Sequence, residues 1–491
     1  MNNNGKHVEG SFRHNFYGVL TIIGGVCIHL FVGSQYIWGN IKWYVTSYFR
    51  QYNPSLTVSS AFIVFPVLVI TNTAMMPFGG YLGRKWNPKI WILIGAGFSL
   101  VWILLSTFVH PFWMFVILYG VWYGIGSSIM FVVPVVWGWE YFPRYKAVVS
   151  GIVIGAFGFG SLIFNLISTS LINPNNVKQV DGYFPPEVAN KVPGTLRIIV
   201  WWWAGLSLIG LLTVTRPKPK RSVSEANCKV LDPATQRLLN NSSVLPTRYN
   251  DEEPEQVSIF RIMKTSQFYL LFIMMYCSSF FGYFILNQYK DFGQRSIKDD
   301  HFLTIVGAIS AAWSGFRFTW AFMMQKMSFK TVYGIMLVMQ MAVTSAIYWS
   351  SQSRASYMIC VWLTIWIQGG HFTILPTICV KLYEERGSQV FTMLFSSFGC
   401  ASMTGVLIVL VLLDKVISYL SVFIICAALT FVSLVLLVAF FKEEPPVLTD
   451  SKQDKQDQMK SSIRSSVPKP QQVPHFSSQD KMVSYYYFRS V

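Results

Sequence analysis

Twelve long apolar segments recur along this chain of 491 residues, and they restrict its fold more than any other feature. A bilayer core of ~30 Å is crossed by about 20 apolar residues in a helix. Hydrophobic residues make up 53% of the chain and charged residues only 12%, which is outside the range of soluble domains. Because the backbone finds no water in lipid, these segments must be helical, and no alternating barrel pattern occurs. We therefore predict an all-α polytopic membrane protein.

The predicted spans are delimited by charged residues. They cover residues 15–41, 55–83, 90–109, 112–139, 147–172, 198–215, 265–289, 302–325, 331–353, 355–380, 388–413 and 416–441. A polar stretch that contains prolines separates the first six from the last six. This pattern predicts an N-terminal half (1–214), a cytosolic linker (215–264), a C-terminal half (265–441) and a disordered cytosolic tail (442–491). A short echo, GAFGFGS at 155–161 and SSFGCAS at 396–402, supports duplicated halves.

Lysine and arginine are concentrated in the loops after every second predicted span and at both ends of the chain. This bias predicts that both termini are cytosolic. The membrane that holds the protein is expected to be the plasma membrane or an endomembrane. The net charge of +17 then reflects topology, and we expect no nucleic-acid partner. The seven cysteines are scattered, so no disulfide framework, metal site or cofactor is expected.

Arg317, in SGFRFTW, is a charged residue inside the predicted span 302–325. Such a group costs at least ~2.5 kcal/mol, so it usually faces a cavity or a partner. The sequence places no Asp or Glu deep in a span to pair with it, because Glu140 and Asp414 lie at span ends. A guanidinium offers a planar fork of donors that suits a carboxylate. We predict that Arg317 binds a small carboxylate; the alternative is a structural arginine that snorkels or bonds helix-end carbonyls.

Several motifs carry a family resemblance. The loop GGYLGRKWNPK after the second span resembles the signature of the major facilitator superfamily, although Gly83 stands where that family usually has Asp. YGVWYGIGSSIMFVVP and YFPRYKAVVSGIVIGAFGFGSLIF resemble the fourth and fifth helices of its oxalate/formate antiporter-like and monocarboxylate transporter branch. GSQYIWGN and SGFRFTW resemble that branch's first and eighth helices. The resemblance implies twelve helices in two halves and a substrate site near the midplane.

The same branch pairs its eighth-helix arginine with further charged residues. In the oxalate transporter it works with a lysine on helix 11, but 388–413 has no basic residue here, which favours a monocarboxylate over a dicarboxylate. Monocarboxylate transporters have an aspartate one turn before the arginine, where this chain has Trp313. They also have a lysine near the outer end of helix 1. In this chain Lys42 lies about two residues out of register with that lysine. It is a candidate for an outer contact with the anion, and the alternative is an interfacial anchor.

Aromatic and amide side chains on helices 1, 4 and 10 are the remaining substrate-binding candidates, because these helices line the path in the family. They are Gln35, Tyr36, Tyr123, Trp362 and Trp366. Each also has an alternative interpretation as a packing residue.

Two histidines fall inside predicted spans, His29 and His371. Histidine titrates near neutral pH, so both are candidates for proton coupling, and His371 is also a candidate substrate contact. The alternative is that each hydrogen-bonds a neighbouring helix.

These patterns predict a secondary transporter of a small organic anion, as symporter or antiporter, and not an enzyme. Its expected partners are the anionic substrate and the bilayer, with a monomer favoured. Two alternatives stay open: the same fold carrying an amino acid, sugar or other neutral solute, and a non-transporting scaffold or sensor.

Overall fold

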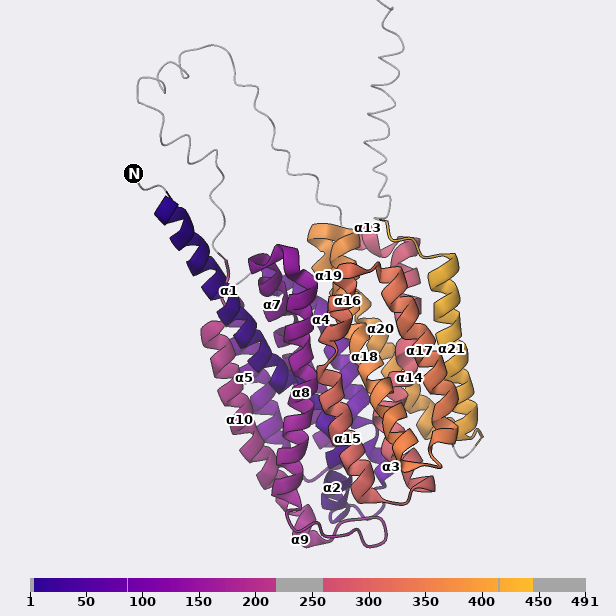
Figure 1. Cartoon of the computed structure of the whole chain (residues 1–491). Helices are drawn as coiled ribbons and strands as arrows, with labels where there is room; N and C mark the ends of the chain where they lie inside the picture. The colour runs from indigo at the N-terminus through magenta and orange to yellow at the C-terminus, as the bar shows by residue number, and fades with distance from the viewer. Residues whose placement is uncertain (1–3, 86, 218–258, 414–415, 445–491) are drawn as a thin grey trace, which may run out of the picture. The chain divides into compact units, whose positions relative to one another are not determined.

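The computed structural model describes residues 4–85, 87–217, 259–413 and 416–444. These residues contain twelve helical spans that are long and apolar enough to cross a membrane, which confirms the predicted fold class (Figure 1). In the same ranges the only extended pairings are two isolated β-bridges.

Six spans form the N-terminal half. The first is α1 (Asn4–Gly33), η1 (Ser34–Ile37) and α2 (Trp38–Arg50), and the second is α3 (Val58–Ala61) and α4 (Val64–Lys85). The others are α5 (Pro88–Ser106); α6 (Phe112–Phe115), η2 (Val116–Trp122) and α7 (Tyr123–Tyr141); η3 (Pro143–Tyr145) and α8 (Lys146–Ile172); and α9 (Pro186–Ala189) with α10 (Lys191–Thr213).

Six further spans form the C-terminal half, after the short helix α13 (Ile259–Met263). They are α14 (Ser266–Ser296); α15 (Asp300–Gly315) and α16 (Phe318–Lys326); α17 (Phe329–Ser350); α18 (Arg354–Tyr383); η4 (Glu384–Arg386), α19 (Gly387–Leu394), α20 (Ser396–Leu407) and η5 (Ile408–Leu412); and α21 (Tyr419–Ala439).

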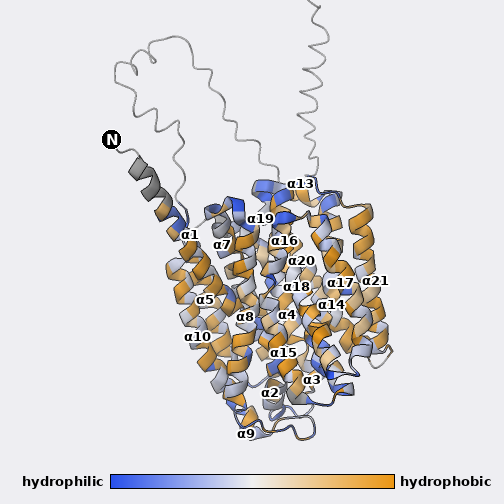
Figure 2. Cartoon of the chain, viewed as in Figure 1, coloured by the Kyte–Doolittle hydropathy of each residue, from blue (hydrophilic) through white to orange (hydrophobic). Residues whose placement is uncertain are grey.

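Hydropathy divides the bundle as a bilayer would. Figure 2 shows hydrophobic residues along the outer sides of the helices and hydrophilic residues gathered at the two ends. Large apolar side chains such as Trp201, Leu212 and Val438 are exposed on these outer sides. A contiguous apolar surface of this kind is stable only against lipid or a partner. The described chain therefore has the surface of an integral membrane protein.

The two halves meet along two sets of helices. Helix α8 contacts α15, α16 and α18, and helix α4 contacts α19 and α20. A side chain at Gly158 would bring its Cβ within 2.4 Å of the backbone nitrogen of Gly315, so only glycine permits this crossing. Gly155 lies beside the same residue, with its Cβ position 3.2 Å from the Gly315 carbonyl oxygen. The glycines of the fifth span thus bring α8 onto the break between α15 and α16.

Three spans are interrupted in the interior of the bundle. The first changes from α1 to the 3₁₀ turn η1, the eighth breaks at Phe316 and Arg317, and the eleventh breaks at Phe395. At the second break the backbone N–H of Arg317 bonds the carbonyl of Ser314 at 3.3 Å, a tight pattern over three residues. Interrupted spans of this kind leave backbone and side-chain groups facing a cavity in transporter folds.

Several predicted spans were shorter than the helices, and two of them changed the placement of charged residues. The first span continues to Arg50 instead of residue 41, and α14 continues to Ser296 instead of residue 289. The predicted spans end at charged residues, but the helices continue through them. As a result Lys42 and Asp291 both lie within helices.

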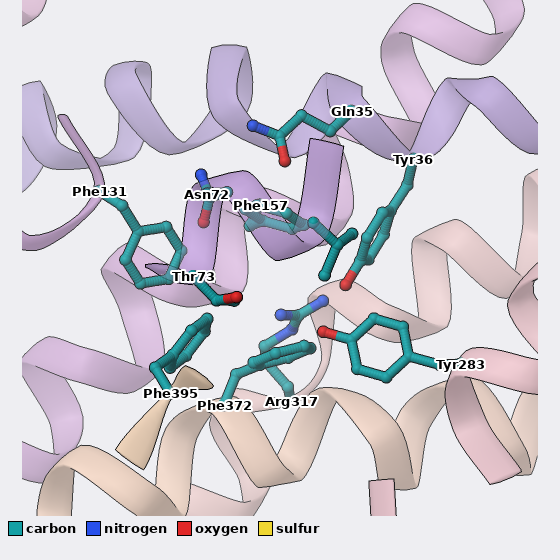
Figure 3. Close-up of a pocket in the computed structure, with 11 residues that line it drawn as sticks. Gln35, Tyr36, Asn72, Thr73, Phe131, Phe157, Tyr283, Arg317, Phe372 and Phe395 are labelled. Carbon is teal, nitrogen blue, oxygen red and sulfur yellow. The ribbon is translucent and has the colours of Figure 1, made fainter. Parts of the chain in front are cut away.

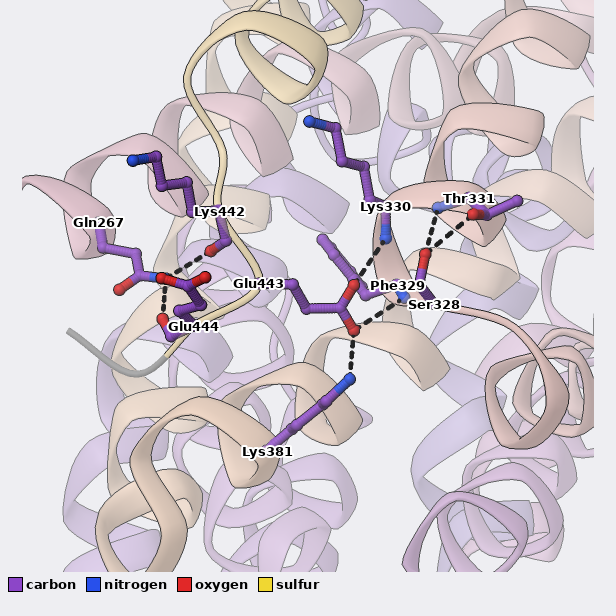
Figure 4. Close-up of polar contacts among 9 residues, drawn as sticks. All are labelled: Gln267, Ser328, Phe329, Lys330, Thr331, Lys381, Lys442, Glu443 and Glu444. Atoms are coloured by element: carbon purple, nitrogen blue, oxygen red, sulfur yellow. Dashed lines mark hydrogen bonds and ion pairs between the residues drawn. The ribbon is translucent and has the colours of Figure 1, made fainter.

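The predicted linker and tail fall largely outside the described residues. Of the linker, the structure describes 215–217 and 259–264. Of the tail, it describes Lys442, Glu443 and Glu444, and these are bonded to the bundle (Figure 4). The side-chain amide of Gln267 donates to the carbonyls of Lys442 and Glu444, each at 2.9 Å. Ordered structure therefore continues a few residues beyond the predicted end of the C-terminal half.

Candidate functional site

A cavity with about 360 Å³ of empty space lies between the two halves. Both halves contribute to it, and all three interrupted spans reach it. Its lining residues are Gln35, Tyr36, Val69, Asn72, Thr73, Phe131, Phe157, Tyr283, Arg317, Phe372 and Phe395. We call this space the central cavity (Figure 3).

Arg317 is the charged residue of the central cavity, and its side chain is buried. Its Nε donates to the Ser314 carbonyl at 2.7 Å, and its Nη2 donates to the Ser314 hydroxyl. The guanidinium carbon lies 5.6 Å and 5.4 Å from the ring centroids of Phe157 and Phe372. Among the described residues no carboxylate pairs with it. The positive charge is therefore held by aromatic rings and one serine, without an acidic partner in that part of the chain.

Two tyrosine hydroxyls face the guanidinium. Figure 3 shows the side chains of Tyr36 and Tyr283 pointing toward Arg317 from opposite halves of the bundle. The ring of Tyr36 is held edge-on between Phe65 and Phe157, with centroids 5.4 Å and 4.9 Å away. Tyr36 was a predicted contact, whereas Tyr283 was missed because an aromatic residue in an apolar helix gives no distinct signal.

Polar side chains form the wall across from Arg317. Figure 3 places Gln35, Asn72 and Thr73 there, and Gln35 was predicted. The amide of Asn72 donates to the Ser127 hydroxyl at 2.8 Å. The Gln35 amide nitrogen is buried and has no acceptor among the described residues. The polar run TNT at 71–73, inside an otherwise apolar span, is the sequence signal that identifies Asn72 and Thr73.

Three of the predicted aromatic contacts lie away from the cavity lining. Tyr123 is buried, with its hydroxyl 3.2 Å from that of Ser34. Trp366 donates to the carbonyl of Phe316 at 3.3 Å, next to the break in the eighth span. Trp362 stacks on Trp313 with ring centroids 6.1 Å apart. Trp366 therefore contacts the residue that precedes Arg317, and the other two pack against neighbours.

The two histidines are fully buried and lie behind the cavity lining. Each ring Nδ1 bonds a carbonyl of its own helix, Gly25 at 2.9 Å for His29 and Ile367 at 3.1 Å for His371. The alternative, a hydrogen bond from each ring to a neighbouring helix, does not occur among the described residues, where each Nε2 has no partner. The His29 ring lies 4.8 Å from the ring of Phe131, which does line the cavity.

Lys42 forms an ion pair with Asp291, with Nζ and Oδ2 2.9 Å apart. It also donates to the carbonyl of Asn287 at 3.3 Å and lies 4.0 Å from the ring centroid of Phe62. Asp291 lies near the end of α14 and pairs with Lys42, not with Arg317. Asp291 was assigned to a loop because the seventh span was ended too early.

Two further spaces lie between the central cavity and one end of the bundle, and neighbouring spaces share lining residues. Tyr36 also lines a second space, the neck, which includes Asn165, Thr169, Thr304 and Ser314 and has about 770 Å³ of empty volume. Thr169 and Thr304 in turn line a larger space, the vestibule, which is bordered by residues of the loop after α8. Figure 1 shows this loop and α9 at the end of the bundle opposite to the start of α1. Tyr36 thus lies at the boundary between the neck and the central cavity that contains Arg317.

A cavity between two six-helix halves, lined by interrupted spans, defines a membrane transporter fold. Residues 22–396 and 305–482 match the model of the Major Facilitator Superfamily, and the chain belongs to this family.

Two curated relatives cover most of the chain. It is 23% identical over 461 residues to apicoplast pyruvate carrier 1 of Toxoplasma gondii. That alignment covers 80% of this chain and 84% of the carrier. It is 19% identical over 393 residues to the uncharacterized MFS-type transporter YhjX of Escherichia coli (strain K12), covering 78% and 85%.

Solved structures share the fold at low identity. The structure of a D-xylose-proton symporter matches with a TM-score of 0.57 and 12% identity, covering 88% of this chain and 98% of that one. The nucleoside transporter NupG matches with a TM-score of 0.53 and 15% identity, covering 86% and 100%. At these identities the likeness concerns the fold alone.

Proposed function

We propose that this chain moves a small organic monocarboxylate across the membrane by alternating access between its two halves. The observation that carries the proposal is Arg317, a buried cation in the central cavity without a carboxylate partner among the described residues. An uncompensated charge in a low-dielectric site is costly, and an anionic substrate supplies the missing partner. The 23% identity to a protein named as a pyruvate carrier supports the same substrate class.

The cavity lining favours one carboxylate over two. Arg317 is the one basic residue among the described residues that line it, so a second carboxylate would lack a cation. The rings of Phe131, Phe157, Phe372 and Phe395 supply apolar walls that suit a short hydrocarbon part. This arrangement is in keeping with the monocarboxylate side of the branch that the sequence resembles.

A neutral solute is the second candidate. Gln35, Asn72 and Thr73 offer the amide and hydroxyl groups with which a sugar or nucleoside is bound, and they line the same cavity. A neutral substrate would leave Arg317 without a counter-ion throughout the cycle, so we rank this candidate lower. A scaffold or sensor without transport is the third.

Counterflow into proteoliposomes separates these candidates. Vesicles loaded with unlabelled pyruvate, lactate, formate or oxalate, and others loaded with D-xylose or a nucleoside, are tested with the matching labelled solute. We expect exchange of pyruvate and lactate by the intact protein, and a loss of at least about 100-fold in Arg317→Gln, since a buried charge pair is broken. Arg317→Lys keeps the charge and loses the fork, so it should retain part of the activity. Exchange of neutral solutes alone would contradict the proposal, and no exchange of any solute would favour the scaffold.

Proton coupling by His371, or by His29, remains a further part of the proposal. Neither ring lines the central cavity, so a proton held there would act through the packing around Phe131 or Tyr333. His371→Gln and His29→Gln test this in vesicles with an imposed pH gradient. Unchanged proton-driven uptake in both variants would reject it.

We also propose that both termini face the cytosol, in the plasma membrane or an endomembrane, and that the protein works as a monomer. The charge bias of the loops supports this orientation. The vestibule then opens on the side opposite to the cytosol. Protease access to the start of α1 in sealed vesicles of known sidedness tests it.

A further inference from the structure

The vestibule carries a dense group of basic side chains. Five basic residues line it, from the loop after α8, the end of α14, the following turn and the start of α18: Lys178, Lys290, Arg295, Lys298 and Arg354. Two acidic residues, Asp291 and Asp299, share the same lining. Basic residues therefore outnumber acidic ones around a space that adjoins the neck.

Both acidic residues already have cationic partners. Asp291 pairs with Lys42, which lies behind the vestibule wall and does not line it, at 2.9 Å. Asp299 pairs with Arg354 at 3.0 Å. Neither carboxylate is left to neutralise Lys178 or Lys298, which are exposed and form no ion pair within the described residues.

The loop that carries Lys178 is attached to the bundle at several points. The Asn173 side chain accepts from the backbone N–H of Val177 at 2.8 Å and donates to its carbonyl at 3.0 Å. Farther along, the N–H of Phe184 donates to the Ser47 hydroxyl at 2.9 Å, and its ring stacks on Tyr44 at 4.3 Å. These contacts hold the positive charge of Lys178 beside the entrance.

The path inward changes character in three steps. The vestibule is basic, the neck is lined by uncharged side chains among the described residues, and the central cavity contains Arg317. Thr169 and Thr304 belong to both vestibule and neck, and Tyr36 belongs to both neck and central cavity. An anion that enters here meets a positive field first and its final counter-ion last.

We propose that the vestibule is an outer collecting site for the carboxylate substrate, with Lys178 and Lys298 as its principal residues. Low-dielectric walls that carry charges of one sign concentrate ions of the opposite sign and accelerate their entry. This effect becomes weaker as the ionic strength rises. The site acts on capture and not on the exchange step, so it lowers KM from this side and leaves the maximal rate unchanged. The inference rests on the proposed transport of an anion and adds the route by which the anion is captured.

The test reverses one charge on the assembled protein. Lys178→Cys is reconstituted, and the membrane-impermeant methanethiosulfonates MTSES and MTSET place a negative or a positive group on the new thiol. At low salt we expect MTSES to raise the KM for pyruvate uptake from the vestibule side by about two- to tenfold. MTSET should restore the original KM, and both differences should disappear near 0.5 M salt at constant osmolality. Lys178→Ser/Lys298→Ser should raise KM in the same salt-dependent way.

Two controls make the result specific. Lys191→Cys places a thiol on an exposed lysine of the same end of the bundle that does not line the vestibule, and it should respond to neither reagent. The unsubstituted protein, treated with both reagents, corrects for the native cysteines. If pyruvate is taken up but its KM is the same after MTSES and after MTSET, the collecting site is overturned and the proposed function is not. Absence of carboxylate uptake in the untreated protein would overturn the proposed function as well.

Discussion

The ammonium of Lys42 in α2 lies 2.9 Å from the carboxylate of Asp291 in α14, and this ion pair joins the two halves of the bundle. The partners differ in their surroundings. The Lys42 side chain is 2% exposed, whereas that of Asp291 is 19% exposed and lines the vestibule. Solvent can therefore reach one partner and not the other.

This difference predicts unequal effects of the two single substitutions. Asp291→Asn leaves a buried ammonium without a counter-charge and should lower the unfolding free energy by about 3–5 kcal/mol. Lys42→Met leaves a carboxylate that water can solvate, so it should cost less than half as much. Thermal unfolding in detergent measures both. The double variant Lys42→Met/Asp291→Leu should recover most of the loss, and equal effects of the two single variants would contradict the explanation.

Gly369 sets the position of the guanidinium. A Cβ there would lie 3.1 Å from Nε and 3.2 Å from Cβ of Arg317, closer than ordinary contacts. We expect Gly369→Ala to displace the arginine and raise the KM for the anion about tenfold, because geometry at a charge-assisted pair is strict. Its thermal stability should change by less than about 1 kcal/mol, since alanine favours the helix. Gly97→Ala, where the added Cβ meets nothing within 4 Å, is the matched control.

Gly158 should tolerate substitution less well than Gly369, because the atom nearest to its Cβ position belongs to the backbone. A Cβ there meets the Gly315 nitrogen at 2.4 Å, and backbone cannot rotate away. Gly158→Ala should separate α8 from α15, lower the unfolding free energy by about 1–3 kcal/mol and reduce the transport rate strongly. Thermal unfolding and counterflow measure the two effects. Gly205→Ala, which has open space around its Cβ, should be neutral in both, and a neutral Gly158→Ala would contradict the close crossing.

Glu443 connects the segment after α21 to the start of α17 through hydrogen bonds (Figure 4). Its carboxylate accepts from Lys381 Nζ at 2.5 Å and from the backbone N–H groups of Phe329 and Lys330 at 3.1 Å and 3.4 Å. Partial burial works to raise the pKa of Glu443, but these hydrogen bonds outweigh it and the pKa lies below its usual value. A carboxyl whose pKa is lower in the folded state stabilises the fold at neutral pH and loses that contribution on acidification.

We therefore expect a pH-dependent effect of Glu443→Gln. At pH 7 it should lower the unfolding free energy by about 1 kcal/mol, as loss of a helix-cap acceptor does. The difference from the unsubstituted protein should shrink as the pH falls below about 4.5, the ordinary value for a glutamic acid. Thermal unfolding across pH 3–7 checks this. Glu444→Gln, a neighbouring exposed carboxyl, serves as the control, and a pH-independent difference would exclude the ionised carboxylate as the cause.

The length of the apolar segments is what allowed the fold to be predicted from the sequence. Twelve apolar segments give the spans without knowledge of any contact, and the cost of a charge in lipid made Arg317 conspicuous. Gln35 and Tyr36 followed from the resemblance. The other predicted aromatic residues, Tyr123, Trp362 and Trp366, share those helices but not the faces that line the cavity, because the rotation of a helix in the bundle depends on packing with distant segments.

The residues that were missed have a common cause. Tyr283 and Phe395 are ordinary in an apolar helix, and only the fold brings them beside Arg317. Asp291 is ordinary at a helix end, and only the length of α14 makes it a partner of Lys42. Interactions between halves that lie more than 200 residues apart are not recorded in local patterns.

The three interrupted spans give the bundle joints around the central cavity. Gln35 and Tyr36, Arg317 and Phe395 each sit where one helical arm ends and the next begins. An arm on either side of such a joint can swing while the opposite arm stays packed, so a few degrees of bending beside the central cavity can open one end and close the other. A substrate bound in the central cavity would then act on the moving parts directly, because residues of the cavity lining lie at these joints.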